Sequence, residues 1–308
     1  MASNNSNESA CTICRRTGDT IKHFGISAAL LTPFQANGSI DTPLLCAHAN
    51  QLLAQGVQGV TLFGTTGEGA SIGEQERSAT IAAAITSGIE SARMTVGLCG
   101  TAIDDIVRQI RQSVDLGITD FLLLPPFYFK DVAEDALRDW HLRLFEEADP
   151  RARFILYHIP QITHVPLSHD LVMRLRRDAP DRVIAIKDSS GVWDNTRALI
   201  DSGDIPVLVG DERLLHKAAA LGAAGSICGM ANLYPDRVRA VFDTHKEDKK
   251  LSSEVDLIVS EPVIPALKLA MAQISSNAAW EYIRPPLQGL TGTARTTILA
   301  AYPGEVFA

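Results

Sequence analysis

The chain has 308 residues and a formal net charge of −8, with 46% hydrophobic and 21% charged residues. This is the balance of an ordinary globular protein. The acidic charge argues against a nucleic-acid or anionic-membrane partner, because both attract basic surfaces, and no apolar run approaches the roughly 20 residues that span a bilayer.

Residues 1–22 begin with a serine- and asparagine-rich stretch and are predicted to form a flexible N-terminal extension. The extension contains Cys11 and Cys14 in a CxxC pair, but no second Cys or His pair follows at metal-ligand spacing. We therefore interpret this pair as free thiols and predict no metal site. The odd total of five cysteines and the lack of an apolar signal segment favour a reducing, cytoplasmic location.

From Phe24 onward, short apolar runs alternate with amphipathic segments. Nearly continuous runs of β-branched and aliphatic residues are typical of strands that are buried on both faces of a parallel sheet. The predicted strands are residues 26–31, 57–63, 94–98, 121–124, 154–157, 183–186, 207–209 and 226–228.

The segments between these runs have helical spacing, and further helices are predicted at 236–245 and 262–275. Either Asp41 or Thr42 is predicted to begin one helix and Ser168 another. Four glycines are predicted to end helices: Gly56, Gly88, Gly117 and Gly222. Eight strands with a helix between each pair predict an α/β fold, a (β/α)8 barrel over residues 23–235, with C-terminal helices in 236–308 that complete it and pack on it. The alternative is an open doubly wound sheet, but its usual GxGxxG turn is missing after the first strand.

In such a barrel, functional groups lie where strands end. The second strand ends in Gly64, Thr65, Thr66 and Gly67, a run that offers backbone N–H and hydroxyl donors without a cation. Such a nest of donors suits a small carboxylate, although a tight turn that needs glycines explains the same residues equally well.

Two tyrosines follow the fourth and fifth strands. Tyr128 lies in an aromatic segment after the fourth strand, where packing, a lid or a subunit contact are all open interpretations. Tyr157 ends the fifth strand, and the two-residue period of a strand places its neighbour His158 on the opposite side of the barrel wall. We interpret His158 as a structural residue.

The sixth strand delivers Lys187, followed by Asp188. A charged lysine that continues an apolar strand is costly to bury, and most such lysines reach the surface or pair with an acid, for which Asp188 is the candidate. A desolvated lysine can instead favour the neutral amine, which attacks a carbonyl and forms a Schiff base. With a carboxylate-binding turn and a tyrosine nearby in the barrel, the second interpretation is favoured.

Four segments in order carry a resemblance: GTTGEG at 64–69, PPFYF at 125–129, YHIP at 157–160 and IKDSSG at 186–191. On the basis of these four segments, the chain resembles the dihydrodipicolinate synthase / N-acetylneuraminate lyase family of pyruvate-dependent barrel enzymes. The resemblance covers roughly residues 24–300. The resemblance implies a small-molecule partner, pyruvate or a 2-oxo acid, no metal or organic cofactor, and a homotetramer built as a dimer of dimers.

The resemblance also implies roles for individual residues. Lys187 is expected to form the Schiff base, and Thr65 and Thr66 to hold the substrate carboxylate. Tyr157 is expected to relay protons, and Tyr128 to reach the neighbouring subunit's site and complete a relay with Thr65 and Tyr157.

One departure concerns the second substrate. In the synthases an arginine two residues after the proline of the YNxP segment binds that substrate's carboxylate, and Ile162 stands at this place. The chain also has His164 where the family has a small glycine, which makes His164 a candidate contact for the distal part of the substrate. In the sugar-acid lyases, acidic residues and a serine bind a hydroxylated tail, and the matching candidates here are Gly210, Asp211, Glu212 and Ser226.

The acids at 211 and 212 have another explanation, because carboxylates at a helix N-terminus are favoured by the helix dipole. The predicted function is a Schiff-base lyase or aldolase that cleaves or forms a 2-keto-3-deoxy acid. The alternatives are the lysine-pathway synthase proper, a dehydratase or deaminase of such an acid, and a non-catalytic pyruvate-binding barrel. A phosphate-ester enzyme ranks last, because the glycines near the eighth strand have no cation beside them except Arg213.

Overall fold

The computed structural model describes residues 24–302, and the predicted extension with its CxxC pair lies outside them. Eight parallel strands form a closed barrel in which each strand pairs with the next and the eighth pairs with the first. This closure confirms the predicted (β/α)8 barrel and excludes the open doubly wound sheet. The strands are β1 (Gly25–Ala29), β2 (Gly59–Leu62), β3 (Met94–Leu98), β4 (Asp120–Leu123), β5 (Arg153–His158), β6 (Val183–Asp188), β7 (Val207–Val209) and β8 (Gly225–Cys228).

Every predicted strand overlaps an observed one, but the first is shorter than expected. We predicted that it continues to Leu31, whereas β1 ends at Ala29. The backbone N–H of Leu31 donates to the Asn232 side chain at 3.0 Å instead of to a neighbouring strand. A side chain from beyond β8 therefore ends the ladder that the apolar run alone would have extended.

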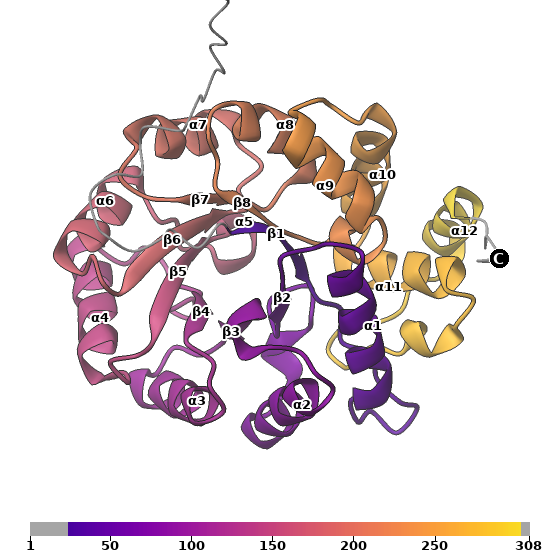
Figure 1. The fold of residues 1–308 in the computed structure, drawn as a ribbon, viewed down its shortest axis with the longest axis horizontal. Helices are drawn as coiled ribbons and strands as arrows, with labels where there is room; N and C mark the ends of the chain where they lie inside the picture. The colour runs from indigo at the N-terminus through magenta and orange to yellow at the C-terminus, as the bar shows by residue number, and fades with distance from the viewer. Residues whose placement is uncertain (1–23, 303–308) are drawn as a thin grey trace, which may run out of the picture.

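Eight helices alternate with the strands and surround the barrel (Figure 1). They are α1 (Thr42–Ala54), α2 (Glu74–Thr86), α3 (Ile103–Asp115), α4 (Glu134–Glu147), α6 (His169–Asp178), α7 (Trp193–Ser202), α8 (Glu212–Ala220) and α9 (Pro235–Thr244). The two predicted N-caps are confirmed, since Asp41 accepts from Leu44 N and Ser168 from Leu171 N, both at 3.1 Å. The four glycines predicted to end helices have φ between 89° and 98°, a conformation that favours glycine.

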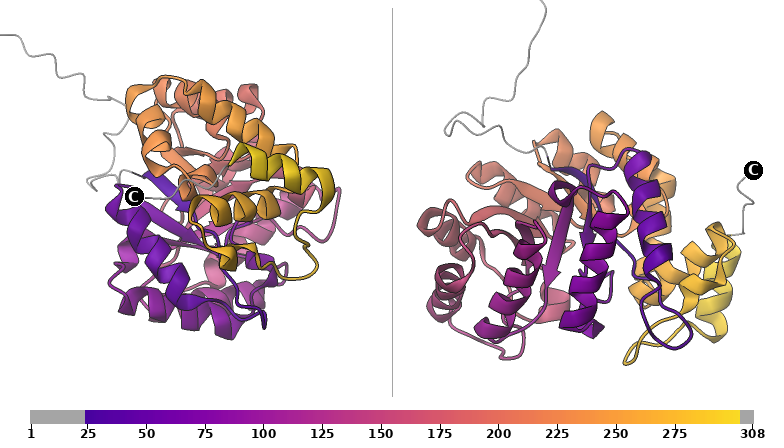
Figure 2. Two further views of the ribbon diagram at one scale, coloured as in Figure 1. Left: turned by 90° about the vertical axis from the view of Figure 1, so that its right-hand side faces the viewer. Right: turned by 60° about the horizontal axis from the view of Figure 1, so that its bottom comes forward.

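The remaining C-terminal helices lie outside this ring (Figures 1 and 2). They are α10 (Lys249–Val259), α11 (Val263–Ile274) and α12 (Gly292–Ala301), with a short 3-10 helix, η5 (Ala278–Glu281), between the last two. Helix α10 packs beside α8, and α11 and α12 lie on the side of α1. Trp280 of η5 is buried, and its ring centre lies 4.9 Å from that of His48 in α1. The C-terminal layer is thus packed onto the side of the barrel where the chain begins.

The core has an inner and an outer layer. Side chains that point into the barrel form one apolar cluster, and those between the strands and the helices form a larger one. Because side chains alternate along a strand, Ile155 and Tyr157 lie inside while Leu156 lies outside. This alternation decides which predicted residues can reach a site inside the barrel. No helix within residues 24–302 is long and apolar enough to cross a membrane.

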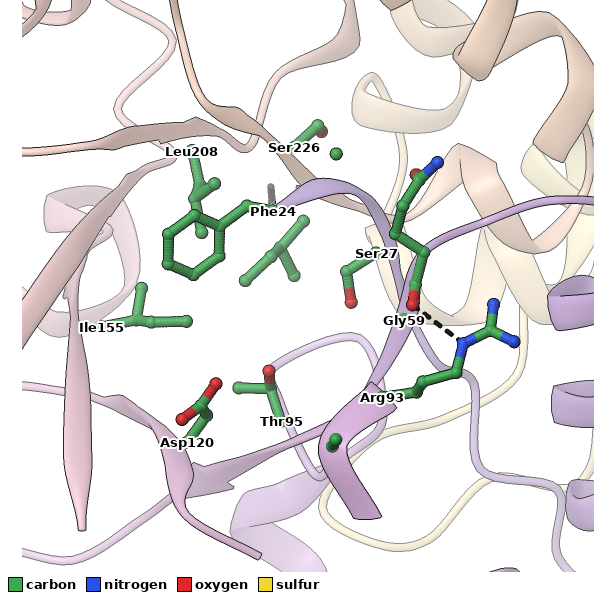
Figure 3. A pocket seen from close by; sticks show the side chains of 13 residues that line it. Phe24, Ser27, Gly59, Arg93, Thr95, Asp120, Ile155, Leu208 and Ser226 are labelled. Atoms are coloured by element: carbon green, nitrogen blue, oxygen red, sulfur yellow. Dashed lines mark hydrogen bonds between the residues drawn. The ribbon is translucent and has the colours of Figure 1, made fainter. Parts of the chain in front are cut away.

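A small pocket of about 50 Å³ lies at the amino-terminal end of the barrel (Figure 3). Its lining includes Phe24, which precedes β1, Thr95 in β3 and Asp120 at the start of β4. Asp120 forms an ion pair with Arg153 of β5 at 2.6 Å. This end of the barrel, opposite to the carboxyl ends of the strands, therefore contains packed side chains and an ion pair between buried Asp120 and partly exposed Arg153.

Candidate active site

Lys187 lies on the inner face of the barrel, close to the carboxyl end of β6. Its side chain is buried, with 5% of its surface exposed. The strand register pairs it with Tyr157 of β5, and its Nζ lies 4.2 Å from the centre of the tyrosine ring. The two residues predicted to carry the chemistry thus face each other across adjacent strands.

Asp188 is not the partner of this lysine. Its carboxylate accepts hydrogen bonds from Thr196 Oγ1 at 2.6 Å, Asn195 Nδ2 at 3.1 Å and the backbone N–H of Ser190 at 3.0 Å. These contacts lie on the helix side of the barrel wall, as strand alternation requires. Among residues 24–302, no acidic side chain forms an ion pair with Lys187, so the amine is buried without the acid that a merely structural lysine would need.

The hydroxyl groups of Thr65 and Tyr157 meet beside this amine. Thr65 Oγ1 and the Tyr157 hydroxyl oxygen are 3.4 Å apart, at the long end of hydrogen-bonding distance. Tyr157 is buried, and Thr65 and Thr66 are half-buried. Thr66 Oγ1 lies toward the end of β8, 3.9 Å from where a Cβ on Gly229 would stand. The two threonines therefore reach toward different sides of the barrel mouth.

The glycines of the 64–69 turn have different physical reasons. A Cβ on Gly67 would lie 2.7 Å from Leu30 O, and one on Gly69 would lie 1.9 Å from Phe63 O, so packing requires both glycines. A Cβ on Gly64 would have no neighbour nearer than 3.9 Å. The tight-turn interpretation therefore accounts for Gly67 and Gly69, whereas a Cβ on Gly64 would make only ordinary contacts with Leu122 and Thr61.

Buried Arg77 of α2 holds this turn from the helix side. Its guanidinium donates to Gly69 O at 2.6 Å and to Gly97 O at 2.7 Å, and it lies 5.0 Å from the Phe63 ring centre. Burial lowers the pKa of the guanidinium from its usual value, yet an arginine stays charged in proteins. The charged Arg77 side chain thus fixes the backbone at Gly69, at the end of the turn that carries the two threonines.

Tyr128 is not brought to the other site residues within this chain. It is 74% exposed, and the neighbouring Phe129 is 69% exposed, with the two rings in edge contact at 5.3 Å. The Thr65 hydroxyl bonds Tyr157, and Tyr128 does not join that pair. A pocket of about 350 Å³ lies beside this segment and is lined by Phe129 and by Trp140 of α4.

Ile162 and His164 lie on the short helix α5 (Pro160–Thr163) and directly after it. Ile162 is 59% exposed, and His164 is exposed with a φ of 51°. Two long side chains fasten this segment: Gln161 Nε2 donates to Ser189 O at 2.6 Å, and Lys130 Nζ donates to Thr163 O at 2.9 Å. Ile162 therefore presents an apolar surface where the resembling synthases are expected to have a cation.

The three residues after β7 are engaged with the protein itself. Gly210 is required by packing, because a Cβ there would lie 1.9 Å from Ser189 Oγ. Asp211 caps α8 and binds Arg213 through Oδ2 and Nη2 at 2.6 Å. Glu212 accepts from Met230 N at 2.7 Å, and burial raises the pKa of its carboxyl. The helix-end interpretation fits Asp211, and neither acid is free for a substrate tail.

Ser226 lies near the start of β8 rather than at its end. Its Oγ donates to Val209 O at 2.6 Å within the barrel wall. The next residue, Ile227, belongs to the inner cluster with Tyr157 and Leu208. Strand alternation thus turns Ile227, not Ser226, toward the barrel interior. Among the described residues, no three His, Cys, Asp or Glu side chains are placed to hold a metal ion.

The sequence analysis missed two buried polar residues next to the site. Asn232 donates to Ala29 O at 2.8 Å and accepts from Leu31 N, so it fixes the end of β1. Lys268 of α11 is completely buried in an otherwise apolar helix, where it pairs with Glu68. A lysine within the run PALKLAMA was a visible signal, but its partner was 200 positions away in the chain.

Comparison with known proteins agrees with this geometry. A family model described as the dihydrodipicolinate synthetase family matches residues 22–302. An uncharacterized DapA-like lyase from Chloroflexus aurantiacus is 33% identical over 287 residues, covering 90% of this chain and 95% of that protein. The crystal structure of dihydrodipicolinate synthase from Agrobacterium tumefaciens is 38% identical with a TM-score of 0.88, covering 91% of this chain and 98% of that one. A chloride-inhibited dihydrodipicolinate synthase from Acinetobacter baumannii, solved with pyruvate, is 26% identical with a TM-score of 0.81, covering 92% and 98%.

Proposed function

This chain belongs to the dihydrodipicolinate synthetase family of lyases, and from that premise we propose that it is a Schiff-base-forming lyase or aldolase acting on pyruvate or another 2-oxo acid. The observation that carries the proposal is Lys187, an amine buried against Tyr157 without an acidic partner among the described residues. A related synthase that was solved with pyruvate supports the substrate class.

The first step is addition of Lys187 Nζ to the C2 carbonyl of the 2-oxo acid. The amine supplies the electron pair, the carbonyl oxygen takes up protons and leaves as water, and a protonated imine remains. Tyr157 lies against the amine and contacts Thr65, so its hydroxyl is the group placed to move these protons.

The imine then serves as an electron sink for breaking or forming a carbon–carbon bond. In the cleavage of a 2-keto-3-deoxy acid, the C4 hydroxyl gives up its proton and the C3–C4 bond breaks. The electron pair of the broken C3–C4 bond moves into the imine to form an enamine, and the C4 fragment leaves as an aldehyde. The enamine takes a proton at C3, and water releases pyruvate and regenerates Lys187. Synthesis runs the same steps in reverse.

The substrate carboxylate is assigned to Thr65 and Thr66. Their backbone N–H and hydroxyl groups are donors, and both residues are half-buried where β2 ends. A carboxylate held there places the C2 carbonyl near the amine, which is the orientation that the first step needs.

Tyr128 is proposed to act in a neighbouring copy of the chain. The support is its 74% exposure, together with the equally exposed Phe129 beside it, because large aromatic side chains left in water mark surfaces that associate. A homotetramer built from dimers is the assembly we propose, with this segment in the contact that completes each site.

Ile162 favours an aldehyde partner without a carboxylate. Its apolar, exposed side chain offers no donor where the resembling synthases have an arginine, so we rank 4-hydroxy-tetrahydrodipicolinate synthesis below cleavage of a 2-keto-3-deoxy acid. With Asp211 and Glu212 engaged by protein groups, their expected contact with a polyol tail requires these bonds to rearrange.

The test is reduction of the imine with borohydride in the presence of pyruvate, followed by intact-mass analysis and peptide mapping. The expected result is one pyruvyl adduct on Lys187 of the wild type and none on Lys187→Ala. Lys217→Ala, which removes an exposed lysine of α8, is the matched control and should be labelled like the wild type.

No adduct on the folded wild type with pyruvate or longer 2-oxo acids would reject the proposal and favour a binding protein. An adduct without aldehyde release from 2-keto-3-deoxy acids, but with loss of water or ammonia, would identify a dehydratase or deaminase instead.

A further inference from the structure

Glu68 and Lys268 form an ion pair that water does not reach. Both side chains have 0% exposure, and the carboxylate Oε1 contacts Lys268 Nζ directly. Burial lowers the pKa of the lysine, while the neighbouring Glu68 opposes that shift. The two residues come from distant parts of the chain: Glu68 follows β2, and Lys268 lies in α11 of the C-terminal layer.

Glu68 is part of the turn that carries the two threonines. Its backbone N–H donates to Thr65 O at 3.0 Å. It adopts a φ of 55° and a ψ of 33°, the left-handed conformation that is unfavourable for a residue with a Cβ. Contacts outside the turn must therefore stabilise this conformation, and the bonds of the Glu68 side chain are the ones that reach the C-terminal layer.

The C-terminal layer holds Glu68 at both carboxylate oxygens. Lys268 occupies one, and the backbone N–H of Arg284 donates to the other at 3.2 Å. Lys268 Nζ also donates to Tyr282 O at 2.8 Å, which links the same two segments. Leu267, the residue before Lys268, lies near Gly229 and so does Thr66. A Cβ on Gly229 would stand 2.9 Å from the Leu267 side chain and 3.9 Å from Thr66 Oγ1. The layer thus borders Thr66 as well as anchoring the turn.

Stability alone is a weak reason for such a pair. The desolvation of two buried charges offsets much of their attraction, and well-packed apolar residues often serve as well. A charged pair does impose a defined geometry on its two backbones. Here one backbone presents Thr65 and Thr66, and the other belongs to helices that form no part of the eight-stranded barrel.

We propose that the Glu68–Lys268 pair positions the carboxylate-binding turn, so that the C-terminal layer sets the affinity of the site for its 2-oxo acid. Both are positioning residues, since both side chains are fully buried and bonded to other protein groups. The inference rests on the proposed function for its ligand but not for its geometry.

The test compares Glu68→Gln, Lys268→Met and the double variant by the rate of borohydride trapping across pyruvate concentrations. Glu68→Gln should raise the half-saturating pyruvate concentration about tenfold, because small misplacements of a binding group cost this much or more, while the rate at saturation changes less than threefold. Asp120→Asn, which breaks the ion pair at the opposite end of the barrel, should lower the melting temperature without changing the half-saturating concentration.

The double variant separates positioning from stability. It removes both charges, so its melting temperature should recover relative to the single variants while the half-saturating concentration stays raised. Recovery of both quantities together, or an equal rise in Asp120→Asn, would overturn the proposal.

Hydrogen exchange of peptides covering 64–72 gives a readout that needs no substrate. Exchange in this segment should rise about tenfold in Glu68→Gln and stay at the wild-type level in Asp120→Asn. If the wild type traps no 2-oxo acid, the proposed function fails, and a rise here would still support a positioned turn. Unchanged exchange would overturn the positioning inference even where trapping succeeds.

Discussion

Two parts of the barrel rim differ in how many buried contacts they make. We call the turn at residues 64–69, after β2, the held half, and the segments at 125–129 and 159–164, after β4 and β5, the exposed half. After β2, the turn with Thr65 and Thr66 is bound by two buried cations, Arg77 from α2 and Lys268 from α11. After β4 and β5, the segments with Tyr128 and Ile162 expose most of those side chains to solvent. The held half contains the threonines proposed to bind the substrate carboxylate. The exposed half contains Tyr128, proposed for the proton relay, and Ile162, proposed to select the aldehyde partner.

This difference separates the proposed site residues that meet within one chain from those that do not. The amine, the Tyr157 hydroxyl and the Thr65 hydroxyl come together within one chain, so their geometry needs no second molecule. Tyr128 points into water and needs something to cover it. Catalytic parts that must be precise lie on strands and braced turns, whereas parts that vary with the substrate lie on exposed loops.

The largest effect is expected at Tyr157, whose hydroxyl contacts Thr65 of the held half. Tyr157→Phe removes the hydroxyl beside the amine and keeps the ring packed on it, so the trapping rate should fall by about 10²–10⁴-fold, the usual contribution of a proton-transfer group. The pyruvate dependence of borohydride trapping measures this. A loss below threefold would show that another group moves the protons.

Acid should weaken both halves alike, because each rests on a buried neutral histidine. His48 supports Asn232 under the held half, and His141 lies in α4 under the exposed half. Burial lowers the pKa of each to about 4 from 6.5. The unfolded chain therefore binds more protons between pH 6.5 and about 4, and the free energy of unfolding is constant above this window and falls within it.

Urea unfolding at pH 7 and pH 5 measures the loss, up to about 1.4 kcal/mol per pH unit for each histidine. His141→Phe removes one of the two, and is sterically suited to a site beside Phe145 and Trp140. It should reduce the slope and leave the contributions of His48 and of His158, whose pKa burial also lowers. An unchanged slope would assign the acid sensitivity to other groups.

A smaller effect tests whether a second copy completes the exposed half. Tyr128→Phe should lower the trapping rate about 10²-fold, the low end for a group in a proton relay. Mixing it with inactive Lys187→Ala should restore activity, because a mixed dimer has one site with an intact lysine and a tyrosine from its partner. Failure to recover in co-expressed mixtures, with mixed dimers seen by native mass spectrometry, would place Tyr128 outside the relay.

The smallest expected change adds a cation to the exposed half. Ile162→Arg should lower the half-saturating concentration of an aldehyde that bears a carboxylate by about fivefold, the gain of one solvent-exposed charged hydrogen bond. Neutral aldehydes of the same length are the control and should be unaffected. Equal responses of both would mean that residue 162 does not select the partner.

The fold and the held half differ in how far the sequence predicts them. Apolar runs and helix caps such as Asp41 and Ser168 predict the barrel, because both depend on a few neighbouring residues. Lys187 and Tyr157 are found for the same reason, since each interrupts or ends an apolar strand. Asp188 was the candidate partner of Lys187 in the sequence, but the structure turns its carboxylate to Asn195 and Thr196 instead.

Contacts between residues that are far apart in sequence could not be predicted in this way. Lys268 and Glu68 are far apart in sequence, and nothing local in either segment names the other. Ser226 was expected at a strand end, but the register of β8 with β7 places it in the wall, bonded to Val209 O. Tyr128 is 74% exposed in the single chain, and its proposed role in a second copy cannot be read from its neighbours in the sequence.

The closing contacts of this fold also determine when it can form during synthesis. β1 pairs with β8, and the Leu31–Asn232 bond spans 201 residues, while the Arg284 bond to Glu68 spans 216. Such long-range contacts form late, because the loop they close is long. A chain still emerging from the ribosome can hold all eight strands and yet lack Lys268. The turn with Thr65 and Thr66 then lacks the Glu68–Lys268 pair, which can form only after α11 has been synthesised.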